Sequence, residues 1–232
     1  MSLRVAERTG AVVALKGLAG AKSRFVDAGP ALRRRLAWCM AVDTLTALAD
    51  TVDQLVLVTA EPAIQGRLRR AGLSITVLAE PVALLDNQRP TGGEHSLNAA
   101  LRAGIAALVG SGADRVIATV GDLPALRPAS VARILAGVGD RPIVIPDLDD
   151  IGSTMIAGPP GSLDPQFGGA SARRHRHAGA AVSPELDQLV DARADVDDPA
   201  ALATAFRIGL GPWTAALVDD QGTLLARPRA AR

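Results

Sequence analysis

Short apolar runs alternate with longer segments of helical periodicity between residues 11 and 145. The runs predict buried strands at 11–15, 54–59, 74–78, 115–120 and 141–145. The segments between them predict helices at 31–49, 64–71, 97–109 and 129–137. This alternation indicates the α/β class, with a mostly parallel, Rossmann-like sheet, right-handed crossovers and helices on both faces.

Such a sheet also predicts where ligands bind, because open parallel sheets bind them beyond the carboxyl ends of their strands. We therefore expect several loops to converge on one site. They are the loops that follow Leu15, Leu78, Val120 and Ile145.

Length and composition favour one domain that spans 1–232. The chain has 232 residues, of which 48% are hydrophobic, enough for a substantial core. Residues 80–94 are rich in Pro, Gly and polar side chains and predict a flexible loop. From Gly209 onward we expect a tail packed on the surface, and we expect disorder near the two ends, at about 1–9 and 222–232.

The charge balance points to small molecules as partners. A formal net charge of +1 argues against a nucleic-acid or membrane footprint, which usually leaves a basic excess. The single cysteine, Cys39, lies among apolar residues and predicts a buried structural thiol. Lys16 interrupts the apolar stretch near the N-terminus, which makes a poor signal peptide, so we expect a cytoplasmic protein.

A loop with two lysines follows the first predicted strand. Lys16 and Lys22 are the only lysines in the chain, and Gly17 and Gly20 lie between them. Backbone amides of such a loop can cradle phosphate oxygens while ammonium groups neutralise them, which suggests a triphosphate site that Arg24 extends. A solvated turn would explain the same residues equally well.

Asp122 follows the fourth predicted strand, between Gly121 and the sequence Leu-Pro. At that place it points into the ligand crevice and offers the oxygen chemistry that Mg²⁺ prefers. The alternative is a turn or capping aspartate, which is common before a proline.

A second acidic motif, Asp195-Val-Asp197-Asp198-Pro, precedes a helical pattern at 200–206. One of these acids is needed to cap the helix, and this alone would justify the motif. Alternating acids also put Asp195 and Asp197 on one side of an extended segment, where they could join a metal held by Asp122.

Glycine and hydroxyl residues recur at 150–154 and 167–171, and a basic segment follows the second of these stretches. Amides of Gly168 and Ser171 with nearby cations such as Arg173 could receive a phosphate or carboxylate. A glycine-rich loop that caps a solvent-exposed basic helix is the alternative.

A zinc site at His175 and His177 is disfavoured. Positions two apart on a helix do not face each other, and no thiolate cluster accompanies them.

Six motifs occur along the chain in the order Leu-Lys-Gly-Leu-Ala-Gly-Ala-Lys-Ser-Arg, Ser-Leu-Asn-Ala-Ala-Leu, Gly-Asp-Leu-Pro-Ala-Leu, Gly-Ser-Thr, Phe-Gly-Gly-Ala-Ser-Ala-Arg-Arg-His and Asp-Val-Asp-Asp-Pro. With these motifs the chain resembles the guanylyltransferases of coenzyme F420 biosynthesis. The resemblance covers nearly the whole chain. The resemblance implies a fold like that of the pyrophosphorylase-like and molybdenum-cofactor nucleotidyltransferases. It also implies transfer of GMP from GTP to a phosphorylated three-carbon acid, with release of pyrophosphate. That acid is phosphoenolpyruvate in the actinobacterial branch and 2-phospho-L-lactate in the archaeal branch.

The resemblance also implies roles for particular residues. The catalytic and nucleotide-binding set is Lys16, Lys22, Arg24, Asn98 and Asp122, with Asn98 at the base and with Lys16, Lys22 and Asp122 in the catalytic role. The acid-binding set is Ser153, Gly168 and Ser171. Mg²⁺ is expected on Asp122 and Asp197, although the choice between Asp195 and Asp197 stays open.

Other readings of the same residues stay open. We expect phosphoenolpyruvate as the acceptor, with 2-phospho-L-lactate and 3-phosphoglycerate as alternatives. A related enzyme could use molybdopterin or a sugar phosphate, and a regulatory protein could bind the nucleotide without catalysis. The sequence also leaves open how strictly GTP is preferred over ATP and whether the chain forms a homodimer.

Overall fold

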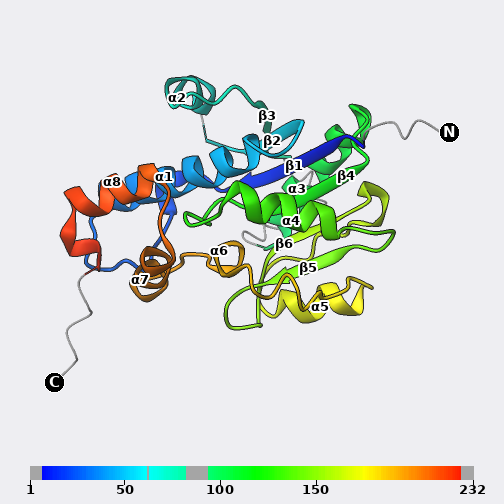
Figure 1. Cartoon of the computed structure of the whole chain (residues 1–232). Coiled ribbons are helices and arrows are strands. Elements are labelled where there is room, and N and C mark those ends of the chain that lie inside the picture. The colour runs from blue at the N-terminus through cyan, green and yellow to red at the C-terminus, as the bar shows by residue number, and fades with distance from the viewer. Residues whose placement is uncertain (1–6, 62, 82–93, 226–232) are drawn as a thin grey trace, which may run out of the picture.

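The computed structural model describes residues 7–61, 63–81 and 94–225. These residues contain a six-stranded sheet with the strand order β3-β2-β1-β4-β6-β5 (Figure 1). The strands are β1 (Thr9–Leu15), β2 (Gln54–Thr59), β3 (Thr76–Ala79), β4 (Arg115–Val120), β5 (Ile143–Pro146) and β6 (Ser153–Gly158). β1 to β4 pair in parallel, whereas β6 runs antiparallel to both β4 and β5. The expected mostly parallel α/β sheet is therefore confirmed.

Helices connect these strands and extend the chain beyond them. They are α1 (Pro30–Ala49), α2 (Ile64–Arg70), α3 (Glu94–Gly110), α4 (Pro128–Gly137), α5 (Ser171–His177), α6 (Val190–Arg193), α7 (Pro199–Ile208) and α8 (Pro212–Asp220). Short 3-10 turns lie at η1 (Leu18–Gly20), η2 (Pro160–Ser162) and η3 (Gly222–Leu225). The helices predicted from the sequence all form, with ends shifted by a few residues.

The two faces of the sheet bury two apolar clusters, because alternate residues of a strand point to opposite sides. On β1, Ala11 and Val13 belong to the cluster that α1 and α4 cover, whereas Val12 belongs to the one beneath α3. α3 lies very close to the sheet, since a Cβ on its Gly104 would come 2.1 Å from Cγ2 of Val12. The expectation of helices on both faces is confirmed.

The sixth strand was not expected from the sequence. Residues 153–158 begin with Ser and Thr, which favoured a loop, yet they form β6 between β4 and β5. An antiparallel neighbour needs no helical crossover, so the alternation of strand and helix gave no sign of it. The strand predicted at 141–145 begins at Ile143 and ends at Pro146.

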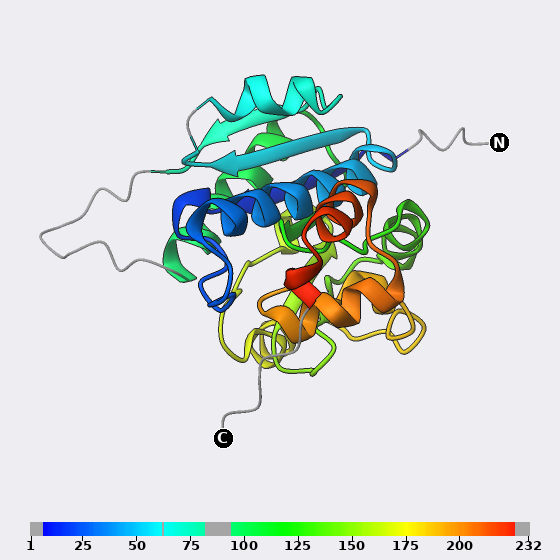
Figure 2. The same ribbon diagram turned by 90° about the vertical axis from the view of Figure 1, so that its left-hand side faces the viewer.

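The expected surface tail from Gly209 is instead an ordered helix. α8 packs beside α1, and its Thr214, Leu217 and Val218 are buried (Figure 2). Asp43 of α1 caps it, because Oδ1 accepts the amide of Trp213 at 3.0 Å and Oδ2 that of Thr214 at 2.8 Å. A charge contributed by another helix thus satisfies amides at the start of α8.

Part of each end of the chain is described. Thr9 belongs to β1, and residues 222–225 form η3. Residues 1–6, 226–232 and most of the predicted 80–94 loop lie outside the described residues.

Two further expectations concern burial and membrane spans. Cys39 is buried as expected, and burial, with a contribution from Asp43, raises the pKa of its thiol to about 11. None of the helices in the described ranges has the length and apolar character needed to cross a membrane.

Candidate active site

The loop after β1 brings Lys22 to the end of β4. Lys16 is exposed one residue beyond β1, and the chain then turns through η1 into Lys22, whose φ is 55°. Leu18 anchors this loop: its side chain is 1% exposed, and its amide donates to Oε2 of Glu61 at 3.0 Å. A left-handed backbone is unusual for a residue other than glycine, and such positions are enriched at functional sites.

Lys22 joins two carboxylates that come from distant segments. Its Nζ lies 2.7 Å from Oδ2 of Asp122 and 3.5 Å from Oδ1 of Asp197, and it also donates to the carbonyl oxygen of Val196. Arg24 reaches the other oxygen of Asp197 at 3.1 Å. The structure therefore brings together four residues that the sequence predicted for the nucleotide and metal sites, namely Lys22, Arg24, Asp122 and Asp197. Val196 lies between the two acids Asp195 and Asp197.

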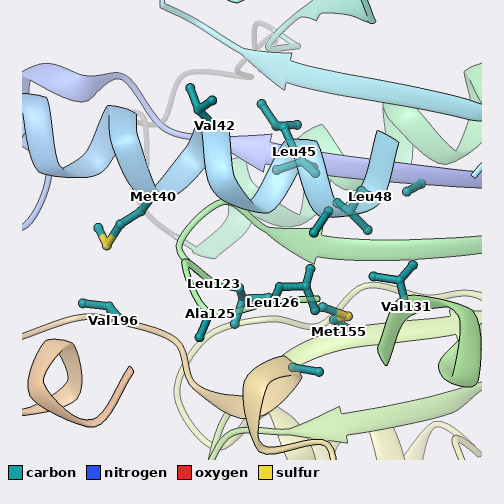
Figure 3. Close-up of a cluster of buried hydrophobic side chains, with 14 of the residues drawn as sticks. Met40, Val42, Leu45, Leu48, Leu123, Ala125, Leu126, Val131, Met155 and Val196 are labelled. Atoms are coloured by element: carbon teal, nitrogen blue, oxygen red, sulfur yellow. The ribbon is translucent and has the colours of Figure 1, made fainter. Parts of the chain in front are cut away.

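Buried neighbours hold these acids in place. Leu123 and Val196 are fully buried in the cluster that also contains Met40 of α1 (Figure 3). The amide of Val196 donates to the carbonyl oxygen of Asp122 at 3.0 Å, which ties the acidic motif to the end of β4. Because Val196 points into the core, the acids on either side of it are available to the crevice.

Charge in this cluster is unevenly balanced. Burial opposes the charge of Lys22, but attraction to Asp122, Asp197 and Asp195 outweighs it, and the pKa of the ammonium is raised. Burial also raises the pKa of Asp195 to about 7, and repulsion from Asp122, Asp197 and Asp147 adds to this. The site thus holds more carboxylates than its buried cation can neutralise, which favours the binding of further positive charge.

The oxygen atoms present suit a hard divalent cation. Oδ1 of Asp122 is buried and has no hydrogen-bond partner among the described residues, although buried carboxylate oxygens are normally paired. Within the same residues, no three His, Cys, Asp or Glu side chains are close enough to hold a metal by themselves. This arrangement fits a hard divalent cation that takes one or two carboxylates and completes its shell with phosphate oxygens and water.

The predicted acid-binding residues gather at the same edge of the sheet. Thr119 of β4 pairs with Met155 of β6, so Ser153, at the start of β6, lies level with the end of β4 that leads to Asp122. Ser171 begins α5, is 1% exposed, and donates its amide to the carbonyl oxygen of Gly168 at 3.1 Å. The structure therefore brings Ser153 to the edge of the sheet where Asp122 lies, and the roles of the acid-binding residues stay predictions.

Asn98 holds the backbone of the neighbouring loop. Its Nδ2 donates to the carbonyl oxygen of Phe167 at 3.0 Å, and its Oδ1 accepts the amide of Phe167 at 2.8 Å. This pair fixes the peptide that leads into Gly168. The role of Asn98 at the nucleotide base stays a prediction.

Two residues near the site were missed by the sequence analysis. Asp147, directly after β5, accepts the amides of Ile151 and Gly152 at 3.0 and 2.6 Å and adds negative charge near Asp195. His175 is 2% exposed, so the alternative of a wholly solvent-exposed basic helix is wrong at this position. Its spacing of four residues from Ser171 places both on one face of α5, which was the available signal.

Comparison with known proteins identifies the family. No protein-family model matches the chain. A phosphoenolpyruvate guanylyltransferase from Streptomyces avermitilis is 43% identical over 212 residues, which are 88% of this chain and 91% of that protein. One from Salinispora arenicola is 37% identical over 213 residues, covering 89% and 91% of the two chains. The chain belongs to the phosphoenolpyruvate guanylyltransferase family.

Solved structures support the fold expected for a phosphoenolpyruvate guanylyltransferase. A putative nucleotide-diphospho-sugar transferase from Desulfovibrio desulfuricans has a TM-score of 0.67 at 16% identity, with 94% of this chain and 97% of that chain covered. A nucleotidyl transferase from Methanothermobacter has a TM-score of 0.53 at 17% identity, with 87% and 97% covered. The nucleotidyltransferase architecture expected from the sequence is confirmed.

Proposed function

We propose that this protein transfers GMP from GTP to phosphoenolpyruvate and releases pyrophosphate. The observation that carries the proposal is the cluster of Lys22, Asp122 and Asp197 at the carboxyl edge of the sheet, in a chain of this family. The cluster combines a buried cation with carboxylates, one of which has an unpartnered oxygen. These are the groups needed to receive a triphosphate together with a divalent cation.

The chemistry requires positioning and charge neutralisation more than proton transfer. An oxygen of the phosphoenolpyruvate phosphate forms a bond to the α-phosphorus of GTP. The bond from that phosphorus to the oxygen of the β-phosphate breaks, and pyrophosphate leaves with the electron pair. The attacking phosphate is already ionised at neutral pH, so no protein base is needed.

Neutralising two polyanions is the main task of the protein. Lys22 and Arg24 are held near Asp197, where they can contact phosphate oxygens, and the exposed Lys16 lies at the mouth of the same loop. Asp122 and Asp197 would hold Mg²⁺, which when bound supplies positive charge for the triphosphate and the leaving group. Asp195, which shares their electrostatic environment, is the alternative second ligand.

Ser153, Gly168 and Ser171 would bind the phosphorylated acid through hydroxyl and amide groups. Ser153 begins β6 beside the end of β4, and Gly168 and Ser171 lie just before and at the start of α5, which packs on β5 and β6. Phosphoenolpyruvate is favoured as the acid because the relatives bear that name. The same contacts would also suit 2-phospho-L-lactate or 3-phosphoglycerate, which remain the alternative acceptors.

An acceptor screen tests the proposal. Purified protein with Mg²⁺ is given GTP or ATP and each of the three acids in turn, and pyrophosphate release is measured with a coupled assay. We expect release with GTP and phosphoenolpyruvate, accompanied by the guanylylated acid in the mass spectrum. Release without an added acid would indicate GTP hydrolysis, and no release with any acid would refute the proposed reaction.

A further inference from the structure

The side chain of His175 is enclosed between two polar groups that approach its two ring nitrogens. Nδ1 lies 3.0 Å from Oγ of Ser153, and Nε2 lies 2.9 Å from the amide nitrogen of Gln166. The ring is 2% exposed and meets the ring of Phe167 edge to face, with centroids 5.1 Å apart and planes at 71°. Its orientation is therefore fixed by contacts on several sides.

The backbone amide determines which nitrogen carries the proton. The amide of Gln166 can only donate, so Nε2 must accept and cannot be protonated. A neutral imidazole has one N–H, which is then on Nδ1 and points at Ser153. Oγ of Ser153 accepts this hydrogen bond, and its own proton is left to point elsewhere.

Neighbouring groups keep this arrangement in place. Burial, with the nearby charge of Arg174, lowers the pKa of His175 to about 4, so the ring stays neutral near pH 7. Arg174 donates to the carbonyl oxygen of Gln166 at 3.0 Å, so the same residue whose amide contacts His175 is held from a second side. The direction of the two hydrogen bonds therefore does not reverse under ordinary conditions.

We propose that His175 is a positioning residue that makes Ser153 donate its hydroxyl proton to the acid substrate. The proposal rests on the proposed function, in which Ser153 contacts the phosphorylated acid. An anion accepts hydrogen bonds only, so a hydroxyl is useful to it only when its proton points outward. Because Nδ1 of His175 donates to Oγ, the hydroxyl proton of Ser153 cannot point at His175. The hydroxyl is therefore oriented to donate to the substrate before the substrate binds.

Two amide substitutions separate positioning from packing. The amide of Asn at position 175 falls near the place of Nδ1, whereas that of Gln falls near the place of Nε2. His175→Gln should therefore lose the donor to Ser153 and raise the KM for phosphoenolpyruvate about three- to tenfold, the effect of one hydrogen bond. His175→Asn should change it less than about twofold, and the KM for GTP should not change in either.

The Ser153→Ala background and a control on the same helix complete the kinetic test. Without the hydroxyl, His175→Gln should add nothing further to the KM for the acid. His177→Gln, at an exposed position of α5, should resemble the parent. Equal effects of Gln and Asn at position 175, or a full effect of His175→Gln in the Ser153→Ala protein, would overturn the proposal.

The protonation state can also be measured without any substrate. Nitrogen-15 chemical shifts of the three histidines, assigned with His95→Gln and His177→Gln proteins, report the tautomer directly. We expect His175 to be neutral with its proton on Nδ1 between pH 6 and 8. A proton on Nε2 would overturn the proposal even if the enzyme is active, whereas failure of the acceptor screen would leave this result intact.

Discussion

The ammonium nitrogen of Lys22 lies 2.7 Å from Oδ2 of Asp122, although 100 residues separate them in the chain. One residue comes from the loop after β1 and the other from the end of β4, two strands that pair directly in the sheet. Adjacent parallel strands end at the same edge, which explains how the two residues meet. The pair defines the centre of the proposed reaction site.

Removing the charge of Asp122 should stop most turnover without unfolding the protein. Asp122→Asn is expected to lower kcat by about 10²–10⁴, the loss typical of a major electrostatic contribution to a transition state. Asp219→Asn, at an exposed position of α8, is the matched control and should behave like the parent. Near-parent activity of Asp122→Asn with a native circular dichroism spectrum would contradict the assignment.

Removing the charge of Lys22 should weaken both nucleotide binding and turnover. Lys22→Ala is expected to raise the KM for GTP and to lower kcat/KM by about 10–100-fold, because triphosphate charge is left uncompensated. Lys16→Ala should act in the same direction but less strongly, since Lys16 is exposed and Lys22 is not. If both variants bind and turn over GTP like the parent, the loop after β1 is only a turn.

The carboxyl of Asp195 should make the protein less stable as pH rises. Its pKa is raised from 3.8 to about 7, so between these values the folded chain holds a proton that the unfolded chain has released. The free energy of unfolding therefore falls across this window, and the loss is complete above about pH 7. In buffer with a chelator, Asp195→Asn should be more stable than the parent at pH 8 by on the order of 2 kcal/mol.

Urea unfolding at pH 5 and pH 8 tests this expectation. The gain from Asp195→Asn should be much smaller at pH 5, and Asp219→Asn should show no such dependence. A parent and an Asp195→Asn protein that lose stability in parallel between the two pH values would show that this carboxyl titrates normally.

Two glycines offer a matched test of how α8 docks on α1. Gly29 and Gly211 both precede the first proline of a helix, with φ values of −63° and −66°. A Cβ at Gly211 would lie 2.4 Å from Cγ of Asp43, whereas a Cβ at Gly29 would meet nothing within 4 Å. Gly211→Ala should therefore lower the free energy of unfolding by about 1–3 kcal/mol, and Gly29→Ala by less than about 1 kcal/mol. Equal effects of the two changes in urea unfolding would contradict the close approach.

The sequence predicted the elements whose hydrophobic residues recur with the period of a buried strand or of a helix with one buried face. β1, β2 and β4 are continuous apolar runs, as expected of parallel strands covered on both faces. β6 was not predicted because it begins with Ser153 and Thr154, two hydroxyl residues that suggested a loop. α8 was not predicted because its capping group, Asp43, belongs to another helix rather than to the residues that precede α8.

The site was predictable to the extent that strand order brings residues together. Lys22, Asp122 and Asp197 meet as the positions of their loops imply. The burial of His175 was not predictable, since a run of Arg and His is typical of an exposed helix. The raised pKa of Asp195 was not predictable either, because it depends on how deeply this carboxyl is buried beside the core residue Val196.

Competition between acceptors for limiting GTP tests the central claim most directly. Equal concentrations of phosphoenolpyruvate and 2-phospho-L-lactate are mixed with the enzyme, Mg²⁺ and GTP labelled at the α-phosphorus, and the labelled products are separated. The relatives are named for phosphoenolpyruvate, and two substrates that differ at a single carbon are typically discriminated by about 10–200-fold, so we expect most of the label in the phosphoenolpyruvate product. Label mainly in the lactate-derived product would contradict the acceptor, and label in neither acid would contradict guanylyl transfer itself.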